Sequence, residues 1–221
     1  MTSDDGARPQ RTDRRFTGDP TRARLLEAAL DSFSTKGFHG TSTRMIAARA
    51  GLSPAAVYVH HRTKEEILFQ ISRDGHQEAL DVVLAAIDSE ATPPGRLRAI
   101  VRDFATWHAR RHTLARVVQY EMAALTPEHA DLIAALRRHT HNAVRGVVLA
   151  GIERGDFTVR DPESTTVALL SLGIDVARWY RADGAWTPQR VGEDYAELAL
   201  RLVGHSPGAS RNQDDEASLA R

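Results

Sequence analysis

The sequence predicts an all-α protein in which a small N-terminal helical domain precedes a larger helical one. Hydrophobic residues recur at helical spacing through most of the chain, and no segment keeps the two-residue alternation of a strand for long. Proline and glycine separate the helical segments, as they commonly do at helix ends. The 221 residues are enough for two domains that each bury an apolar core.

Apolar spacing and capping residues define the expected helices. Leu26 and Phe33 lie on one face of a first helix over 20–36. Thr63 and Glu66 have the spacing of a capping box, in which each side chain satisfies a backbone amide, and they mark the start of a long helix. Proline and glycine mark several later boundaries. The further helices are expected over 63–88, 95–110, 113–124, 127–154, 162–182 and 188–203.

Composition argues against several classes of protein. The chain has no cysteine, which excludes disulfides and thiolate metal sites. No stretch reaches the roughly 18 uncharged apolar residues of a membrane span, and the polar N-terminus lacks the apolar core of a signal peptide, so we expect a cytoplasmic protein without a membrane partner. The histidine spacings do not suit a metal site, and phosphate-loop, dinucleotide-loop and GxSxG motifs are absent. We therefore expect no metal, no cofactor and no enzymatic activity.

Charge is divided unevenly along a chain whose formal net charge is zero. Residues 1–66 contain 11 Lys and Arg against 8 Asp and Glu, whereas the remainder contains 18 against 21. This mild asymmetry favours the N-terminal part as the one that faces phosphate.

The most informative segment covers residues 41–66. Thr41 or Ser42 can cap a short helix, and Gly51 permits a tight turn after it. Ser53 and Pro54 suit the N-cap and first position of a second helix that follows at once. Two helices separated by so short a turn are typical of a helix-turn-helix.

The second helix of this motif has an outer face suited to DNA. Val57 is expected to point inward, and Ala55 and Ala56 to lie outside. Small outer side chains let a helix enter a major groove about 12 Å wide, and their methyl groups can contact thymine methyls.

Together with the helix over 20–36, this segment resembles the N-terminal domain of the tetracycline-repressor (TetR) family. The resemblance implies a three-helix helix-turn-helix domain followed by a larger helical ligand-binding and dimerisation domain, about nine helices in all. On this basis we expect a flexible basic arm at 1–19, the DNA-binding domain at 20–66, the regulatory domain at 67–205 and a disordered tail at 206–221. The matching residues are Gly37-Phe38, Thr41-Ser42, Ile46-Ala47, Ala50-Gly51-Leu52-Ser53, Ala55-Ala56, Val57-Tyr58, His60 and Thr63-Lys64-Glu65-Glu66-Ile67.

The resemblance also implies which residues contact a double-stranded, palindromic DNA operator. Hydroxyls, a phenol and a lysine suit phosphate oxygens, and such contacts set register rather than base preference. Arg44 is the candidate for bidentate reading of a guanine. The expected phosphate contacts are Ser42 or Thr43, Ser53, Tyr58, His60 and Lys64, and the residues expected near bases are Arg44, Ala55 and Ala56.

One residue departs from the family pattern. The family usually has a packed Phe where this chain has His61. The imidazole could fill that space with a hydrogen bond, or turn outward to phosphate, and the sequence leaves both interpretations open.

The larger domain carries more aromatic and basic residues than a core needs, and the family encloses a small-molecule effector between its middle helices. Each such residue could instead pack in the core or lie on the surface. Residues 175–181 further resemble regulators of lipid or steroid catabolism that respond to acyl-coenzyme A thioesters, whose phosphates suit arginine. Arg178 could equally form an inter-subunit salt bridge. The candidate ligand-binding residues are Trp107, His108, His112, Tyr120, Arg178 and Trp179.

Two late helices carry apolar stripes that suit a homodimer. An antiparallel pair from each subunit would bury the stripes in a four-helix bundle, with Gly173 allowing close approach. The alternative is that one subunit buries both. The stripe residues are Leu169, Leu170, Gly173, Ile174 and Ala177, then Val191, Tyr195, Leu198 and Leu202.

These features predict a dimeric transcriptional repressor that a small-molecule effector releases from its operator. The rival interpretation is a helical adaptor that binds protein through Tyr58 and the neighbouring alanines and does not bind DNA.

Overall fold

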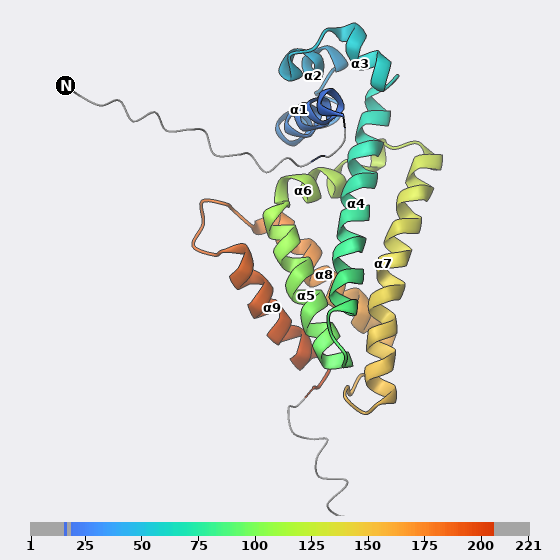
Figure 1. The fold of residues 1–221 in the computed structure, drawn as a ribbon, viewed down its shortest axis with the longest axis vertical. Helices are drawn as coiled ribbons and strands as arrows, with labels where there is room; N and C mark the ends of the chain where they lie inside the picture. The colour runs from blue at the N-terminus through green and yellow to red at the C-terminus, as the bar shows by residue number, and fades with distance from the viewer. Residues whose placement is uncertain (1–15, 17–18, 206–221) are drawn as a thin grey trace, which may run out of the picture. The chain divides into compact units, whose positions relative to one another are not determined.

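The computed structural model describes Phe16 and residues 19–205, and these are helical almost throughout (Figure 1). The all-α prediction is confirmed for this part of the chain, where no strand is found. The predictions for the arm at 1–19 and the tail at 206–221 lie outside the described residues, apart from Phe16 and Asp19. The elements are α1 (Pro20–Lys36), α2 (Thr43–Ala50), α3 (Pro54–His60), α4 (Lys64–Asp88), α5 (Pro93–Arg110), α6 (His112–Tyr120), the 3-10 helix η1 (Met122–Ala124), α7 (Pro127–Glu153), α8 (Pro162–Trp179) and α9 (Pro188–Leu202).

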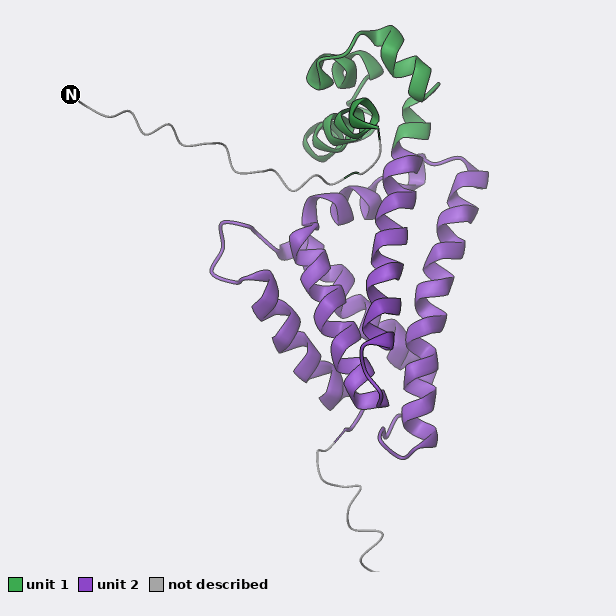
Figure 2. Ribbon diagram, in the orientation of Figure 1, with its two compact units in different colours: residues 1–67 green, residues 68–221 purple. Residues whose placement is uncertain are grey.

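The chain divides into two compact units, residues 1–67 and residues 68–221 (Figure 2). In the first unit α1 packs against α2, and α2 against α3. Leu26, Phe33, Ile46 and Val57 are buried between these helices, which gives the unit its own apolar core.

Side-chain caps account for where most helices begin. Thr126 accepts a hydrogen bond from the backbone N–H of His129, and Asp161 accepts two from the first turn of α8. Proline follows each of these caps, at a position where its missing N–H leaves no bond unmade. The same combination of cap and proline occurs at Asp19, Ser53, Thr92 and Thr187.

Some predicted boundaries were wrong for local reasons. The helix expected from residue 95 begins at Pro93, because Thr92 caps it and prolines fit its first turn. The segment over 113–124 is α6 followed by the separate 3-10 turn. The helix over 162–182 ends at Trp179.

The capping box at the start of α4 is made in a shifted form. Thr63 Oγ1 accepts from the N–H of Glu66 at 3.0 Å, as the spacing predicts. Glu66 Oε2, however, accepts from the N–H of Arg62 at 2.7 Å, one residue before the expected partner.

In the second unit α5 packs against α7, α8 and α9, so it forms the centre of the helical packing. Gly192 allows α9 to pack closely against α5, because a Cβ at this position would lie 2.5 Å from the carbonyl oxygen of Arg102. Gly173 on α8 has a similar role, since its Cβ would lie 2.5 Å from the Phe104 ring. The close approach predicted for Gly173 is therefore to α5 of the same subunit.

The burial of α8 and α9 corrects the predicted dimer stripe. Leu169, Ala177 and Val191 are buried within their own subunit, which matches the alternative interpretation for these positions. Leu198 and Leu202 remain 46% and 48% exposed. None of the helices in residues 19–205 has the length and hydropathy needed to cross a membrane.

Candidate DNA-binding face and ligand cavity

A tight turn joins α2 to α3 in the first unit. Gly51 adopts the left-handed conformation, with φ 65° and ψ 35°, which glycine enters without steric cost. The N–H of Leu52 donates to the carbonyl oxygen of Ala47 at 2.9 Å, so the end of α2 is closed by a C-capping turn. Ser53 then caps α3, and the two helices form a helix-turn-helix as the sequence predicts.

The outer face of α3 is uncharged and combines small side chains with Tyr58. Val57 is fully buried and anchors the helix. Ala55 is exposed, and Ala56 is half-buried beside it. Val59 has 81% of its surface exposed, although the sequence analysis did not select it. Its exposure follows from helical geometry, because it stands two residues after the buried Val57 and so faces away from the core.

Hydroxyl groups line both helices of the motif. Ser42 Oγ and Ser53 Oγ accept the backbone N–H groups of Met45 and Ala56, and each hydroxyl keeps its own proton to donate. The Tyr58 hydroxyl lies 3.4 Å from Thr43 Oγ1, which brings α2 and α3 together at their exposed side. This arrangement suits contacts with phosphate oxygens.

The basic candidates have different surroundings. Arg44 is exposed. His60 is half-buried, and its Nε2 lies 3.8 Å from Asp19 Oδ2. Lys64 Nζ donates to the carbonyl oxygens of Phe38 at 2.6 Å and Thr41 at 2.7 Å. The lysine therefore fixes the α1–α2 connection, a role that the sequence analysis missed.

His61 occupies the position at which the family pattern has Phe, and only 8% of it is exposed. Of the two interpretations that the sequence left open, the structure supports the packing histidine, because an outward-facing ring would be accessible.

The second unit contains a cavity of about 390 Å³, a size typical of small-ligand sites. Its walls come from α4, α5, α6, η1, α7 and α8. No Asp or Glu occurs among the described residues that line it. Apolar side chains dominate the lining, and the polar and basic members are His76, Trp107, His108, Gln119, Arg137, Arg138, Thr140, His141 and Ser171.

Two imidazoles in the cavity wall are held neutral. Burial lowers the pKa of His108 to about 4, against the effect of its hydrogen bond to Phe104. The pKa of His76 is also lowered to about 4, mainly by burial and then by electrostatic interaction with Arg137 and with the His108 ring. His108 Nδ1 lies 2.8 Å from the carbonyl oxygen of Phe104, which can only accept, so Nδ1 carries the proton.

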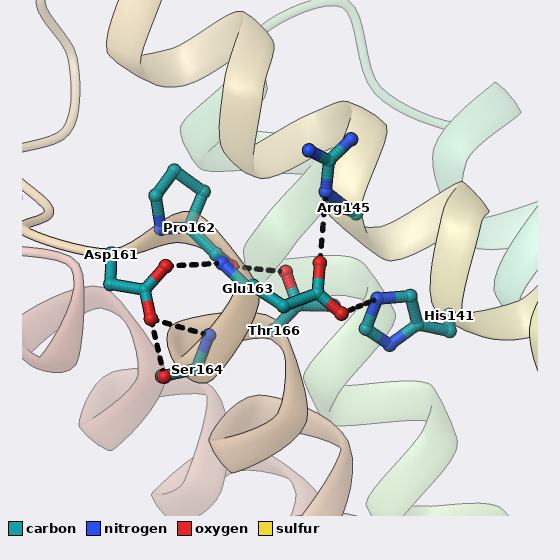
Figure 3. Close-up of polar contacts among 7 residues, drawn as sticks. All are labelled: His141, Arg145, Asp161, Pro162, Glu163, Ser164 and Thr166. Atoms are coloured by element: carbon teal, nitrogen blue, oxygen red, sulfur yellow. Dashed lines mark hydrogen bonds and ion pairs between the residues drawn. The ribbon is translucent and has the colours of Figure 1, made fainter.

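A polar network ties α7 to α8 beside the cavity (Figure 3). The two oxygens of Glu163 contact His141 Nε2 at 2.9 Å and Arg145 Nε at 3.1 Å. Asp161 accepts from the N–H groups of Glu163 and Ser164, which fixes the first turn of α8. His141 is thus both a cavity residue and part of the contact that positions α8.

The six predicted ligand residues differ in whether they line the cavity. Trp107 and His108 line the cavity, and the other four lie outside the lining formed by the described residues. His112 contacts the Tyr180 ring, and Arg178 pairs with Asp175 on its own helix. Tyr120 is exposed, and Trp179 packs against Trp186 and Tyr195.

Several cavity residues were missed, and some had a signal in the sequence. Arg137, Arg138 and His141 form a basic run within an otherwise amphipathic helix, which could have indicated a functional face. His76 had no comparable signal, because its place in the wall depends on how α4 packs against α5.

A helix-turn-helix with an exposed recognition helix, followed by a helical unit with a ligand-sized cavity, defines the class of ligand-responsive transcriptional regulators. Family models agree with this class. Residues 25–71 match the bacterial regulatory proteins of the tetR family, and residues 90–203 match the tetracycline-repressor-like C-terminal domain. The chain belongs to the TetR family.

Individual relatives cover most of the chain. It is 30% identical over 196 residues to the transcriptional repressor KstR2 of Mycobacterium tuberculosis, covering 81% of this chain and 90% of the relative. A solved tetR-family regulator from Rhodococcus RHA1 is 41% identical, with a TM-score of 0.81, and covers 86% of this chain and 100% of its own. The structure of the ketosteroid transcriptional regulator KstR2 of M. tuberculosis is 25% identical, with a TM-score of 0.78, over 86% and 97% of the two chains.

Proposed function

We propose that this chain is a homodimeric transcriptional repressor that binds a palindromic double-stranded DNA operator and is released by a small-molecule effector. The observation that carries the proposal is the outer face of α3, where small and hydroxylated side chains are exposed while Val57 anchors the helix. A buried outer face could not reach the base edges of a major groove. In this role the protein acts in the cytoplasm and has no catalytic activity.

The proposed DNA contacts follow from exposure and chemistry. Arg44, Ala55 and Ala56 read base edges. Ser42, Thr43, Ser53, Tyr58 and His60 contact phosphates. Lys64 contributes to phosphate binding through its positive charge and by fixing the loop before α2, since its ammonium already donates to two carbonyl oxygens.

Exposed apolar residues on α8 and α9 support a dimer. Val167 on α8 is 51% exposed, and Leu198 and Leu202 on α9 are nearly as exposed. A two-fold contact through α9 would bury Leu198 and Leu202 from each subunit. A dimer also presents two copies of α3 to two half-sites, about one turn of DNA apart.

The effector proposed for the cavity is an acyl-coenzyme A thioester or its acyl group. The relative KstR2 is described as a ketosteroid regulator. Residues 175–181 resemble the subgroup that responds to acyl thioesters. Arg137 and Arg138 supply the positive charge that a thioester's phosphates would need, a role the sequence analysis gave to Arg178.

The proposed mechanism is a shift between two populations. A ligand in the cavity favours one arrangement of the helices around it, and α4 is continuous from the first unit into the second. If that arrangement spaces the two copies of α3 wrongly for adjacent grooves, effector and DNA oppose one another reciprocally.

Fluorescence anisotropy tests the DNA-binding part. A labelled duplex from upstream of the protein's own gene is titrated with the wild type and with Arg44→Ala/Tyr58→Ala. Between about 50 and 200 mM salt, the wild-type affinity should fall by about a thousandfold, because counterions leave the DNA on binding. The double variant should bind weakly with a smaller salt slope. Arg160→Ala, which removes an exposed arginine elsewhere, should behave as the wild type.

The exposed Val59 and Tyr58 favour a second candidate, an adaptor that binds protein through α3. An apolar docking face would lose little affinity over the same salt range. Absence of binding to both this duplex and random DNA would support the adaptor and refute the repressor.

A further inference from the structure

Two residues that line the cavity each have a buried side-chain nitrogen with no hydrogen-bond partner among the described residues. These nitrogens are Nε1 of Trp107 on α5 and Nε2 of His76 on α4. Native proteins rarely leave such atoms unpaired, because each has lost its water without gaining a replacement. A ligand that fills the cavity can supply the missing partners.

Hydrogen-bonding chemistry restricts what that partner is. The indole N–H of Trp107 only donates, so the ligand must present an acceptor. The neutral ring of His76 also donates when its proton is on Nε2. A keto oxygen, which has two lone pairs and no proton, is an acceptor that suits either group. An aliphatic carbon in the same place would leave both atoms unpaired.

The charged side chains that line the cavity restrict the rest of the ligand. The described lining contains no carboxylate to balance a cation, whereas Arg137 and Arg138 line the cavity and are exposed. His76 faces Arg137 on α7 and His108 on α5. The apolar majority of the lining suits a hydrocarbon body, and the arginines suit an anionic end.

We propose that Trp107 and His76 form a subsite for a keto oxygen on the hydrocarbon body of an anionic effector. This inference rests on the proposed function, because it specifies the ligand of the same cavity. The two buried donors distinguish an oxidised acyl group from the saturated one of equal length. Arg137 and Arg138 hold the anionic end of either compound.

Calorimetric titration of the full chain without DNA tests the subsite. The probes are decanoate and its 5-oxo, 7-oxo and 9-oxo derivatives. At least one oxo acid should bind the wild type about tenfold more tightly than decanoate, which is the effect of one additional buried hydrogen bond. Trp107→Phe keeps the ring and removes the N–H, so it should abolish this preference and change decanoate binding less than about twofold. His76→Phe should reduce the preference independently. Trp179→Phe, outside the cavity lining, should retain it.

Three results would overturn the proposed subsite. The subsite is refuted if no oxo acid binds more tightly than decanoate, or if the preference survives in both Trp107→Phe and His76→Phe. Failure of all four acids to saturate the protein by about 1 mM also overturns it. Because DNA is absent, an oxo preference in a protein that binds no DNA would support the subsite and refute the repressor. DNA binding without an oxo preference would do the reverse.

Discussion

The Lys64 ammonium lies 4.1 Å from the centre of the Phe38 ring and donates to the carbonyl oxygen of the same residue at 2.6 Å. A second bond to Thr41 fixes the loop that leads into α2. A charged donor to a backbone carbonyl contributes about 1.5–3 kcal/mol, and the contact with the ring contributes roughly 0.5–1 kcal/mol.

Replacement of this lysine should therefore destabilise the protein. We expect Lys64→Met to lower the free energy of unfolding by about 2–4 kcal/mol, because two carbonyl oxygens lose a charged donor. Urea denaturation measures the change. Lys36→Met removes the other described lysine, which is exposed at the end of α1, and should cost less than about 1 kcal/mol. Equal effects of the two substitutions would show that Lys64 has no special structural role.

Gly51, in the turn of the helix-turn-helix, should be sensitive to replacement by alanine. A Cβ at this position would contact nothing within 4 Å, so Gly51→Ala introduces only the strain of the left-handed backbone, about 1–2 kcal/mol. Gly146→Ala is the matched control, since it also meets nothing within 4 Å but lies within helix α7. That substitution should stabilise the protein by up to about 1 kcal/mol. Thermal unfolding of both variants gives the comparison, and a stabilising Gly51→Ala would contradict the assigned turn.

Acidification should destabilise the second unit through its buried histidines. The unfolded chain protonates His76 and His108 near pH 6.5, whereas the folded chain does so near pH 4. Between these values the unfolded state binds more protons, so stability rises with pH and is lost as pH falls from 6.5 to 4. Each group contributes up to about 3 kcal/mol. The urea midpoint at pH 7 and pH 5 measures the loss.

His108→Phe provides the control for this pH dependence. It removes one of the two titrating rings and keeps an aromatic side chain of similar shape in the core. Its midpoint should change less between pH 7 and pH 5 than that of the wild type. An unchanged pH dependence would show that His108 does not titrate as the geometry implies.

The proposed dimer depends on exposed leucines of α9. Leu198→Glu/Leu202→Glu should convert dimers to monomers at about 10 µM, because burial of each leucine is worth roughly 1.5–3 kcal/mol. Analytical ultracentrifugation measures the assembly. Leu132→Glu changes a leucine of α7 that is 55% exposed and should leave the dimer intact. A wild type that sediments as a monomer would refute the proposed dimer.

The sequence correctly predicted the features that depend on residues close together along the chain. The caps Ser42 and Ser53 and the turn at Gly51 involve neighbours along the chain, and all three are observed where they were expected. The family pattern predicted Lys64 as a phosphate ligand. Its hydrogen bonds to Phe38 and Thr41 were not predicted, because they join residues more than 20 positions apart. Such bonds leave no periodic signal.

The cavity was harder to predict because six elements must meet to form its walls. Trp107 and His108 were found, since aromatic and imidazole side chains clustered at the end of one helix. His76 was missed because its contacts come from other helices. Gly173 was correctly read as a point of close approach, but only the packed structure shows that Phe104 of the same subunit is its neighbour.

In vitro selection from random double-stranded DNA tests the central claim most directly. The account predicts that the wild type enriches one palindrome with half-sites about one helical turn apart, and that Arg44→Ala relaxes base preference at one position in each half-site. Enrichment of no common sequence by the wild type would contradict the assignment of α3 as a recognition helix.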